Sequence, residues 1–260
     1  MPQLARITIY PVKSLDGLSV TSARVLPSGA IEHDRRYAIV DADGWLVIGK
    51  RTPLVHSIRS VFDPEAHTLT LRAQGSNMPR SFELDRDRGS LDAHLSYLLG
   101  QVVSLVENPD SGFPDDTDAP GPTVLGTGTV EAVAGWFKLE PDDVRARFRA
   151  NLEIGGVDPF WEDRLYGAAG SVIRFRIGDV VLEGTNPCQR CVVPSRSQTT
   201  GEVLAGFQKH FAERRRASLP AWADASRFDH FYRLAVNTRL APDAPGTIQV
   251  GDTVSILGSP

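Results

Sequence analysis

The stretch SVIRFRIGDVVL, residues 171–182, contains two runs of apolar and β-branched residues on either side of a Gly-Asp pair at 178–179. A Gly-Asp pair between two such runs is typical of a tight β-hairpin. The pattern recurs near the C-terminus, where 251–252 is again Gly-Asp within residues 248–257. We therefore expect a hairpin at each place and a β-rich second half of the chain.

The composition agrees with short strands. The chain of 260 residues contains 23 glycines and 18 prolines, and residues of this kind favour turns over long helices. Hydrophobic residues make up 41% and charged residues 23%, which is ordinary for a globular protein and excludes a disordered chain. The expected class is mostly β, of the α+β kind, with two lobes.

Charge and hydropathy exclude two classes of partner. The net charge is -4, without the excess of basic residues that nucleic-acid binding requires. Neither a signal peptide in residues 1–17 nor an apolar run of about 18 residues is present, so we expect no membrane partner and a cytoplasmic location.

The first part of the chain is expected to form a meander of strands. Its short runs of β-branched and aromatic residues alternate with turn residues, and a later pair of runs predicts a further hairpin. The apolar spacing of 91–99 predicts a short helix that ends at Gly100. The expected strands are 6–10, 20–26, 37–40, 45–48, 68–72 and 81–84.

Residues 109–122, PDSGFPDDTDAPGP, contain little apolar surface and many turn residues. We interpret them as a connector or surface loop. It divides the chain into a first lobe, 1–108, and a second lobe, 123–260.

Three helices are expected in the second lobe. Thr129 would cap a helix over 129–138, Pro141 would open the next, running towards 150, and 201–218 would form the third. The third contains three arginines at 214–216, which we interpret as a solvated helix end favoured by the helix dipole.

Cys188 and Cys191 are the only cysteines, and they form a Cys-x-x-Cys pair after a predicted strand. Their spacing excludes a disulfide between distant segments, and two thiols are too few for a cluster that needs four thiolates. A redox dithiol, half of a zinc site, a thiolate metal ligand and a pair of buried small side chains remain open. Zinc would need further ligands, and a thioredoxin-like pair would need a helix where Pro194 follows.

Basic and hydroxyl residues lie in other predicted turns. They are Lys13 with Ser14, Arg35, and Arg149 with Asn151. Taken singly, each of these residues is most often an ordinary solvent-exposed side chain. Together with a thiolate, one ammonium group and several guanidinium groups are what an anionic, phosphate-bearing metal cofactor requires.

The sequence resembles the MOSC domain proteins that carry an N-terminal β-barrel domain. This family includes the mitochondrial amidoxime-reducing component and the C-terminal part of molybdenum cofactor sulfurase. The matching motifs follow the family's order over nearly the whole chain. They are YPVKS (10–14), DR (34–35), RFRANL (147–152), ED (162–163), CQRC (188–191), TG (200–201), PGTI (245–248) and VGD (250–252).

The resemblance implies a molybdenum cofactor, Mo-molybdopterin, held between the lobes. It makes Cys191 the protein ligand to molybdenum and the catalytic residue, and a soft thiolate suits such a metal. It also implies that charged and polar side chains of both lobes contact the pterin or its phosphate. These are Lys13, Ser14 and Arg35 in the first lobe and Arg149, Asn151, Gln189, Arg190 and Asn237 in the second.

Two functions follow from the resemblance. One is a molybdenum-dependent reductase that reduces N-hydroxylated or similarly oxidised small molecules by two electrons. A separate electron-donor protein is expected, because the two lobes leave no further domain for a flavin or ferredoxin. The alternative is a sulfur-carrier or cofactor-handling module with a reactive cysteine, which needs a similar thiolate.

Overall fold

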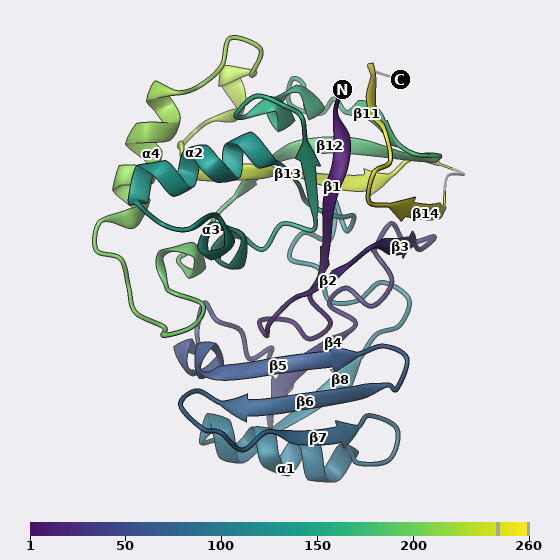
Figure 1. The fold of residues 1–260 in the computed structure, drawn as a ribbon, viewed down its shortest axis with the longest axis vertical. Helices are drawn as coiled ribbons and strands as arrows, with labels where there is room; N and C mark the ends of the chain where they lie inside the picture. The colour runs from purple at the N-terminus through teal and green to yellow at the C-terminus, as the bar shows by residue number, and fades with distance from the viewer. Residues whose placement is uncertain (243–244, 259–260) are drawn as a thin grey trace.

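The computed structural model describes residues 1–242 and 245–258. Strands account for 33% of the residues and helices for 23%, which confirms the mostly β class. In Figure 1, strands β5–β7 and helix α1 lie at one end of the molecule, and helices α2, α3 and α4 lie on one side of the other part.

An eight-stranded sheet forms the larger part of the molecule. Its strand order is β15-β11-β12-β13-β9-β10-β1-β2, and every neighbouring pair is antiparallel except β9 and β10. The strands are β1 (Gln3–Ile9), β2 (Leu18–Val20), β9 (Val124–Gly126), β10 (Leu152–Gly155), β11 (Ile173–Ile177), β12 (Val180–Gln189), β13 (Arg233–Leu240) and β15 (Val254–Gly258).

The hairpin predicted at 171–182 is confirmed. Ile177 pairs with Val180 across a two-residue turn, and Gly178 takes the first turn position with φ +56°. A positive φ at that position is what a side chain other than glycine resists.

The second Gly-Asp hairpin was a wrong prediction. Strand β14 (Gly246–Gln249) pairs with β3 (Ser22–Val25), whereas β15 pairs with β11. The chain does turn at Gly251, whose φ is +98°, but its amide donates to Leu4 O of β1 at 2.8 Å. Strands β14 and β15 therefore pair with segments that are distant in the sequence, and not with each other.

The first lobe contains two small sheets and one helix. Strand β4 (Tyr37–Asp41) pairs with β8 (Val103–Glu107), and β5 (Ile58–Asp63), β6 (Thr68–Ala73) and β7 (Arg80–Glu83) form a three-stranded sheet. The predicted β6–β7 hairpin and helix α1 (Arg88–Leu99), which ends at Gly100, are confirmed. Residues 45–48 form no strand, since only an isolated bridge joins Leu46 to Val40.

Strand pairing joins the two halves of the sequence. Strand β1 pairs with β10, and β3 pairs with β14, so these two early strands form part of the second lobe's structure. The single predicted strand 20–26 is divided into β2 and β3 at Thr21, because the two segments pair with different partners. Strands on one side of the predicted division at 109–122 therefore pair with strands on its other side.

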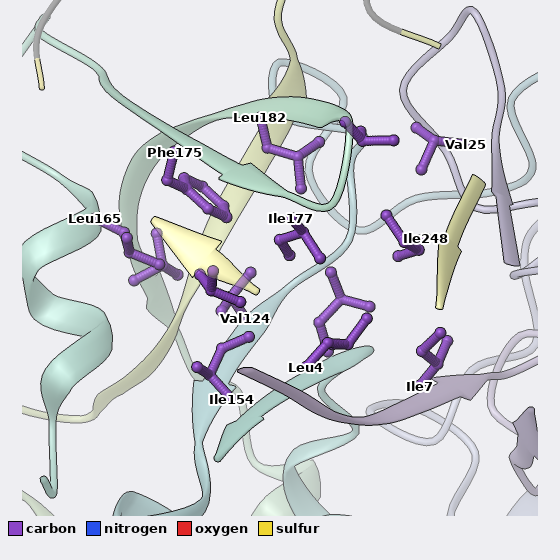
Figure 2. Close-up of a cluster of buried hydrophobic side chains, with 14 of the residues drawn as sticks. Leu4, Ile7, Val25, Val124, Ile154, Leu165, Phe175, Ile177, Leu182 and Ile248 are labelled. Atoms are coloured by element: carbon purple, nitrogen blue, oxygen red, sulfur yellow. The ribbon is translucent and has the colours of Figure 1, made fainter. Parts of the chain in front are cut away.

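A large apolar core lies against the eight-stranded sheet. Figure 2 shows how side chains far apart in sequence meet there, including Leu4 of β1, Phe175 of β11 and Ile248 of β14. A second core fills the first lobe around Tyr37 and Leu91. The β1–β10 and β14–β3 pairs are thus supported by shared apolar burial as well as by backbone hydrogen bonds.

Three helices surround a third core, which contains Phe148, Phe207 and Phe211. They are α2 (Thr127–Phe137), α3 (Pro141–Phe148) and α4 (Phe207–Ala217), and the 3-10 helices are η1 (Pro53–Ser57), η2 (Trp161–Leu165), η3 (Val193–Ser195) and η4 (Ala225–Arg227).

Two predicted helix starts were wrong. Helix α2 begins at Thr127, and the Thr129 hydroxyl is buried on Glu162 instead of capping the helix. Helix α4 begins at Phe207 instead of 201, because Gly206 before it has a positive φ of +70°.

The interpretation of residues 214–216 as a solvated helix end was wrong for Arg215. Its side chain is 1% exposed and forms an ion pair with Asp163. Arg214 and Arg216 are exposed, as expected. The buried position follows from helix geometry, because Arg215 lies one turn beyond Phe211 on the face that packs inward.

Within the described parts of the chain, each helix is too short or too polar to cross a membrane.

Candidate functional site

A cavity of about 630 Å³ is lined by residues of both predicted lobes and of the 109–122 connector. The structure brings every residue of the predicted site to this one cavity. Its lining includes Lys13, Ser14, Arg35, Arg149, Asn151, Gln189, Arg190, Cys191 and Asn237.

Three of these residues have left-handed backbone conformations. The φ angles of Ser14, Arg35 and Arg149 are +74°, +49° and +53°. Such angles are uncommon for residues with a side chain, and they concentrate at functional sites, where the surrounding structure holds them. For Arg149 the cause is local, because it is the residue that ends helix α3.

Hydrogen bonds across the lobes fix Arg35 and Asn151. The Arg35 guanidinium donates to Asn151 Oδ1 at 3.3 Å and to Arg149 O at 3.5 Å. Asn151 is buried, and its Nδ2 donates to Thr8 O at 3.1 Å. Asp34 forms an ion pair with Arg35 and also accepts from Tyr10 N at 2.8 Å. The position of Arg35 therefore depends on both lobes.

Tyr10 lies beneath two guanidinium groups and was missed as a site residue. The Arg149 carbon Cζ is 4.0 Å from the centre of the Tyr10 ring, and that of Arg35 is 5.3 Å away. Burial, together with the neighbouring Arg35, lowers the pKa of Arg149. Two cations beside one buried ring form a site that an anion would stabilise. The motif containing Tyr10 was recognised, but the aromatic ring itself gave no separate signal.

Arg190 has a guanidinium nitrogen without a partner. Its Nε donates to Leu234 O at 2.9 Å and its Nη1 to Phe148 O at 3.0 Å. Its Nη2 is buried and makes no hydrogen bond in the structure. A buried donor of this kind is costly unless a ligand or water satisfies it, and Arg190 lines the cavity. The free donor fits an anionic ligand.

The two cysteines are free thiols at the end of β12. Cys191 is exposed and lines the cavity, and its Sγ accepts from Val193 N at 3.5 Å. Cys188 is half-buried, and burial together with Asp115 and Asp116 raises its pKa, against the opposing effect of Arg190. Of the two thiols, Cys191 is the one more open to a ligand.

Two alternative uses of the cysteine pair gain no support. Among residues 1–242 and 245–258, no cluster of three or more His, Cys, Asp or Glu could hold a metal ion, so a complete zinc site is absent there. The pair is followed by η3, a 3-10 helix of three residues beginning at Val193, instead of the α-helix that a thioredoxin-like dithiol uses. The described residues therefore support neither a protein-only zinc site nor a thioredoxin-like dithiol at this pair.

The connector supplies acidic residues that the sequence analysis missed. Lys13 forms an ion pair with Asp115, and Asn237 Nδ2 donates to Asp116 Oδ2 at 2.9 Å. The run of aspartates in 115–118 was the available signal, but its turn composition suggested only a loop. Instead, this segment lines the cavity.

His56 also lines the cavity without having been predicted. It is 3% exposed, and its Nε2 has no hydrogen-bond partner among the residues that the structure describes. Burial and the nearby Arg196 and Arg149 lower the pKa of His56 to about 4, so the ring is neutral at pH 7. A single histidine in η1 carries no sequence signal that separates it from an ordinary core histidine.

Two family models match the chain. The MOSC N-terminal beta barrel domain matches residues 1–101, and the MOSC domain matches residues 128–255. The 26 residues between the two matches contain the whole connector, and the cavity is lined by residues of both matched regions.

Known proteins with similar sequences include an amidoxime-reducing component and a molybdenum cofactor sulfurase. Human mitochondrial amidoxime-reducing component 1 is 25% identical, over 98% of this chain and 83% of its own length. The molybdenum cofactor sulfurase of Drosophila mojavensis is 25% identical over 77% of this chain, which spans only 29% of that protein. Among solved structures, the YUAD protein of Bacillus subtilis aligns with a TM-score of 0.42 and 10% identity, covering 100% of this chain and 97% of its own.

The matched domains follow one another in the family's order and together cover most of the chain. This chain therefore belongs to the MOSC family and carries an MOSC N-terminal beta barrel domain followed by a MOSC domain.

Proposed function

We propose that this protein binds the molybdenum cofactor in the cavity between the lobes and reduces N-hydroxylated small molecules. The observation that carries the proposal is the convergence of Lys13, Arg35, Arg149 and Arg190 on one cavity that also exposes the Cys191 thiol. A phosphate-bearing ligand with a thiophilic metal matches both chemistries.

The residues present fit such a group. The buried Arg190 Nη2 offers a donor without a protein partner, and Arg149 and Arg35 lie close together over Tyr10. These cations would hold the phosphate, Asn151 would fix Arg35, and Cys191 would be the protein ligand to molybdenum. The bound cofactor would supply two-electron oxygen-atom-transfer chemistry, which no side chain can perform alone.

The balance of the reaction assigns further tasks to the protein. Reduction of an amidoxime to an amidine consumes two electrons and two protons and releases water. We place the substrate in the remaining space of the cavity, beside Cys191, and we place the protein in the cytoplasm. Electrons would come from a separate donor protein, since the sequence has no dinucleotide-binding glycine motif after a strand.

The test is reduction of benzamidoxime by protein made in a host that synthesises the cofactor. Molybdenum and pterin content are measured first, and benzamidine is then followed with NADH or with reduced methyl viologen. We expect turnover with viologen and none with NADH alone. Full molybdenum loading without viologen-dependent turnover would contradict the reductase, and turnover with NADH alone would contradict the separate donor.

A sulfur-carrier or cofactor-handling role is the second candidate. The observation in its favour is that Cys188 and Cys191, both free thiols, line the same cavity. In that case the cofactor would leave the purified protein readily, or a cysteine would carry a persulfide that mass spectrometry detects. Molybdenum that survives extensive dialysis would favour the reductase.

A further inference from the structure

The connector supplies hydrogen-bond acceptors to the ammonium group of Lys13. Lys13 Nζ donates to Phe113 O at 2.9 Å and forms an ion pair with Asp115, and the lysine is only 6% exposed. An ammonium group has three donors. The connector therefore takes two of the three donors of a residue that is expected to hold the ligand's phosphate.

The same segment is anchored on two other residues of the predicted site. Phe113 N donates to Arg35 O at 2.9 Å, and Asp116 accepts from Asn237 Nδ2 at 2.9 Å. The other oxygen of Asp116 accepts from the amides of Asp118 and Ala119, which holds the turn. The connector thus bridges groups of both lobes at the edge of the cavity.

The Asp115 carboxylate lies in the field of the cavity's cations. The positive charges of Lys13, Arg35 and Arg149 lower the pKa of Asp115. Its side chain is nevertheless 80% exposed to solvent. A carboxylate held by one ion pair and otherwise open to solvent can leave at small cost.

We propose that Asp115 is a built-in competitor for the anionic end of the ligand, holding Lys13 until a phosphate group displaces it. This inference rests on the proposed function only in that the ligand carries a phosphate. The ligand binds only those protein molecules in which Lys13 is not paired with Asp115. The Asp115–Lys13 pair therefore lowers the apparent affinity in proportion to the fraction of molecules in which Lys13 is free. The connector is thereby an autoinhibitory element as well as a linker.

The test measures the binding of inorganic phosphate to the full chain, prepared in a host that does not make the cofactor, by isothermal titration calorimetry at low, fixed ionic strength. Asp115→Asn is expected to tighten binding about two- to fivefold, the range expected for loss of one partly exposed ion pair. Asp110→Asn is the matched control, because Asp110 is an exposed connector residue outside the cavity lining. It changes the net charge equally and is expected to leave the affinity within about twofold.

A second background separates competition for Lys13 from a general effect of charge. In Lys13→Gln protein, Asp115→Asn should no longer tighten phosphate binding. A gain that persists there would show that Asp115 acts through its field alone and would overturn the proposal. Equal phosphate affinity of the wild type and Asp115→Asn, or no phosphate binding by either, would also overturn it.

Failure of this proposal and failure of the proposed function have different signatures. Molybdenum and pterin content of the purified wild type reports on the function alone. Protein without cofactor whose phosphate binding depends on Asp115 through Lys13 would retain this inference and reject the function. A wild type that carries the cofactor when made in a competent host, but whose cofactor-free chain shows no dependence of phosphate binding on Asp115, would retain the function and reject this inference.

Discussion

Arg215 of α4 and Asp163 of η2 form an ion pair that is almost wholly buried, with the two side chains 1% and 4% exposed. The guanidinium carbon also lies 4.3 Å from the centre of the Phe160 ring and 5.0 Å from that of Phe228. The pair therefore joins a helix to the 3-10 segment beside the central sheet. Removing one member of a buried pair leaves the other charge uncompensated.

We predict that Arg215→Ala lowers the free energy of unfolding by about 3–5 kcal/mol. Arg214→Ala changes an exposed neighbour in the same helix and should cost less than about 0.5 kcal/mol. Urea unfolding followed by circular dichroism measures both. Equal effects of the two variants would show that Arg215 behaves as a surface arginine.

Glu162 predicts a dependence of stability on pH. Its Oε2 accepts from Thr129 Oγ1 at 2.8 Å and from Gly126 N at 3.2 Å, whereas its Oε1 is buried without a partner. Burial and the adjacent Asp163 raise the pKa of Glu162 to about 8. Between the ordinary carboxyl range and pH 8, the folded state therefore holds a proton that the unfolded state has released. Stability due to this group falls as the pH rises through that window.

Glu162→Gln should remove this loss, because the amide keeps an acceptor for Thr129 and does not ionise. The wild type is expected to lose up to about 1.4 kcal/mol per pH unit from this group. Unfolding free energies at pH 5.5 and 7.5 are compared for the wild type, Glu162→Gln and the exposed control Glu131→Gln. An unchanged slope in Glu162→Gln would show that the buried carboxyl ionises normally.

Cys191→Ser is predicted to abolish molybdenum-dependent turnover and to change the metal's absorption spectrum, because a hydroxyl is a poor ligand for a thiophilic metal. Cys188→Ser serves as the matched variant, since it removes the less exposed thiol of the same cavity. We expect it to retain the metal spectrum. If Cys188→Ser lost the spectrum while Cys191→Ser kept full turnover, the ligand assignment would be reversed.

Arg149→Met should separate binding from stability. The Arg149 guanidinium is half-buried beside Arg35, and desolvation is the main cause of its lowered pKa, so the charge costs the ligand-free protein free energy. We expect the free energy of unfolding of the Arg149→Met variant to lie within about 1 kcal/mol of the wild-type value or above it, as when buried charges are replaced by apolar groups.

The same substitution should weaken cofactor retention roughly five- to hundredfold, the loss expected for one charged contact. Lys13→Ala and Arg35→Ala should weaken it to a similar degree. Molybdenum remaining after dilution and gel filtration measures retention, with the exposed Arg86→Ala as control. Full retention by all three variants would mean that these cations do not hold the cofactor.

Local sequence patterns predicted the elements whose partners are near in sequence. The β11–β12 and β6–β7 hairpins and helix α1 are of this kind. The patterns did not give the remote pairings: β8, which was not predicted, pairs with β4 some 60 residues earlier, and β14 and β15 have separate partners instead of each other. A Gly-Asp turn specifies a reversal of the chain, but burial elsewhere decides which strands meet.

The residues of the candidate site that were predicted differ from those that were missed in the same respect. Residues in recognisable motifs, such as Lys13 and Arg149, lie on one cavity, although their roles toward a cofactor stay predictions. His56, Asp115 and Tyr10 were missed, because each gains its place from long-range contacts. Arg215 was misread for a related reason, since only the packing of α4 makes one of three consecutive arginines internal.

The pairing of β3 with β14 has a consequence for synthesis. Ser22 pairs with Gln249, and Gln3 of β1 pairs with Gly155, so the earliest strands to leave the ribosome must wait for partners made much later. Contacts of such sequence separation make folding slow and leave strand edges open meanwhile. Because the cavity is built between these late-joined parts, any ligand that fills it must arrive after translation is nearly complete. A nascent chain would expose the unpaired edges of its first strands until then.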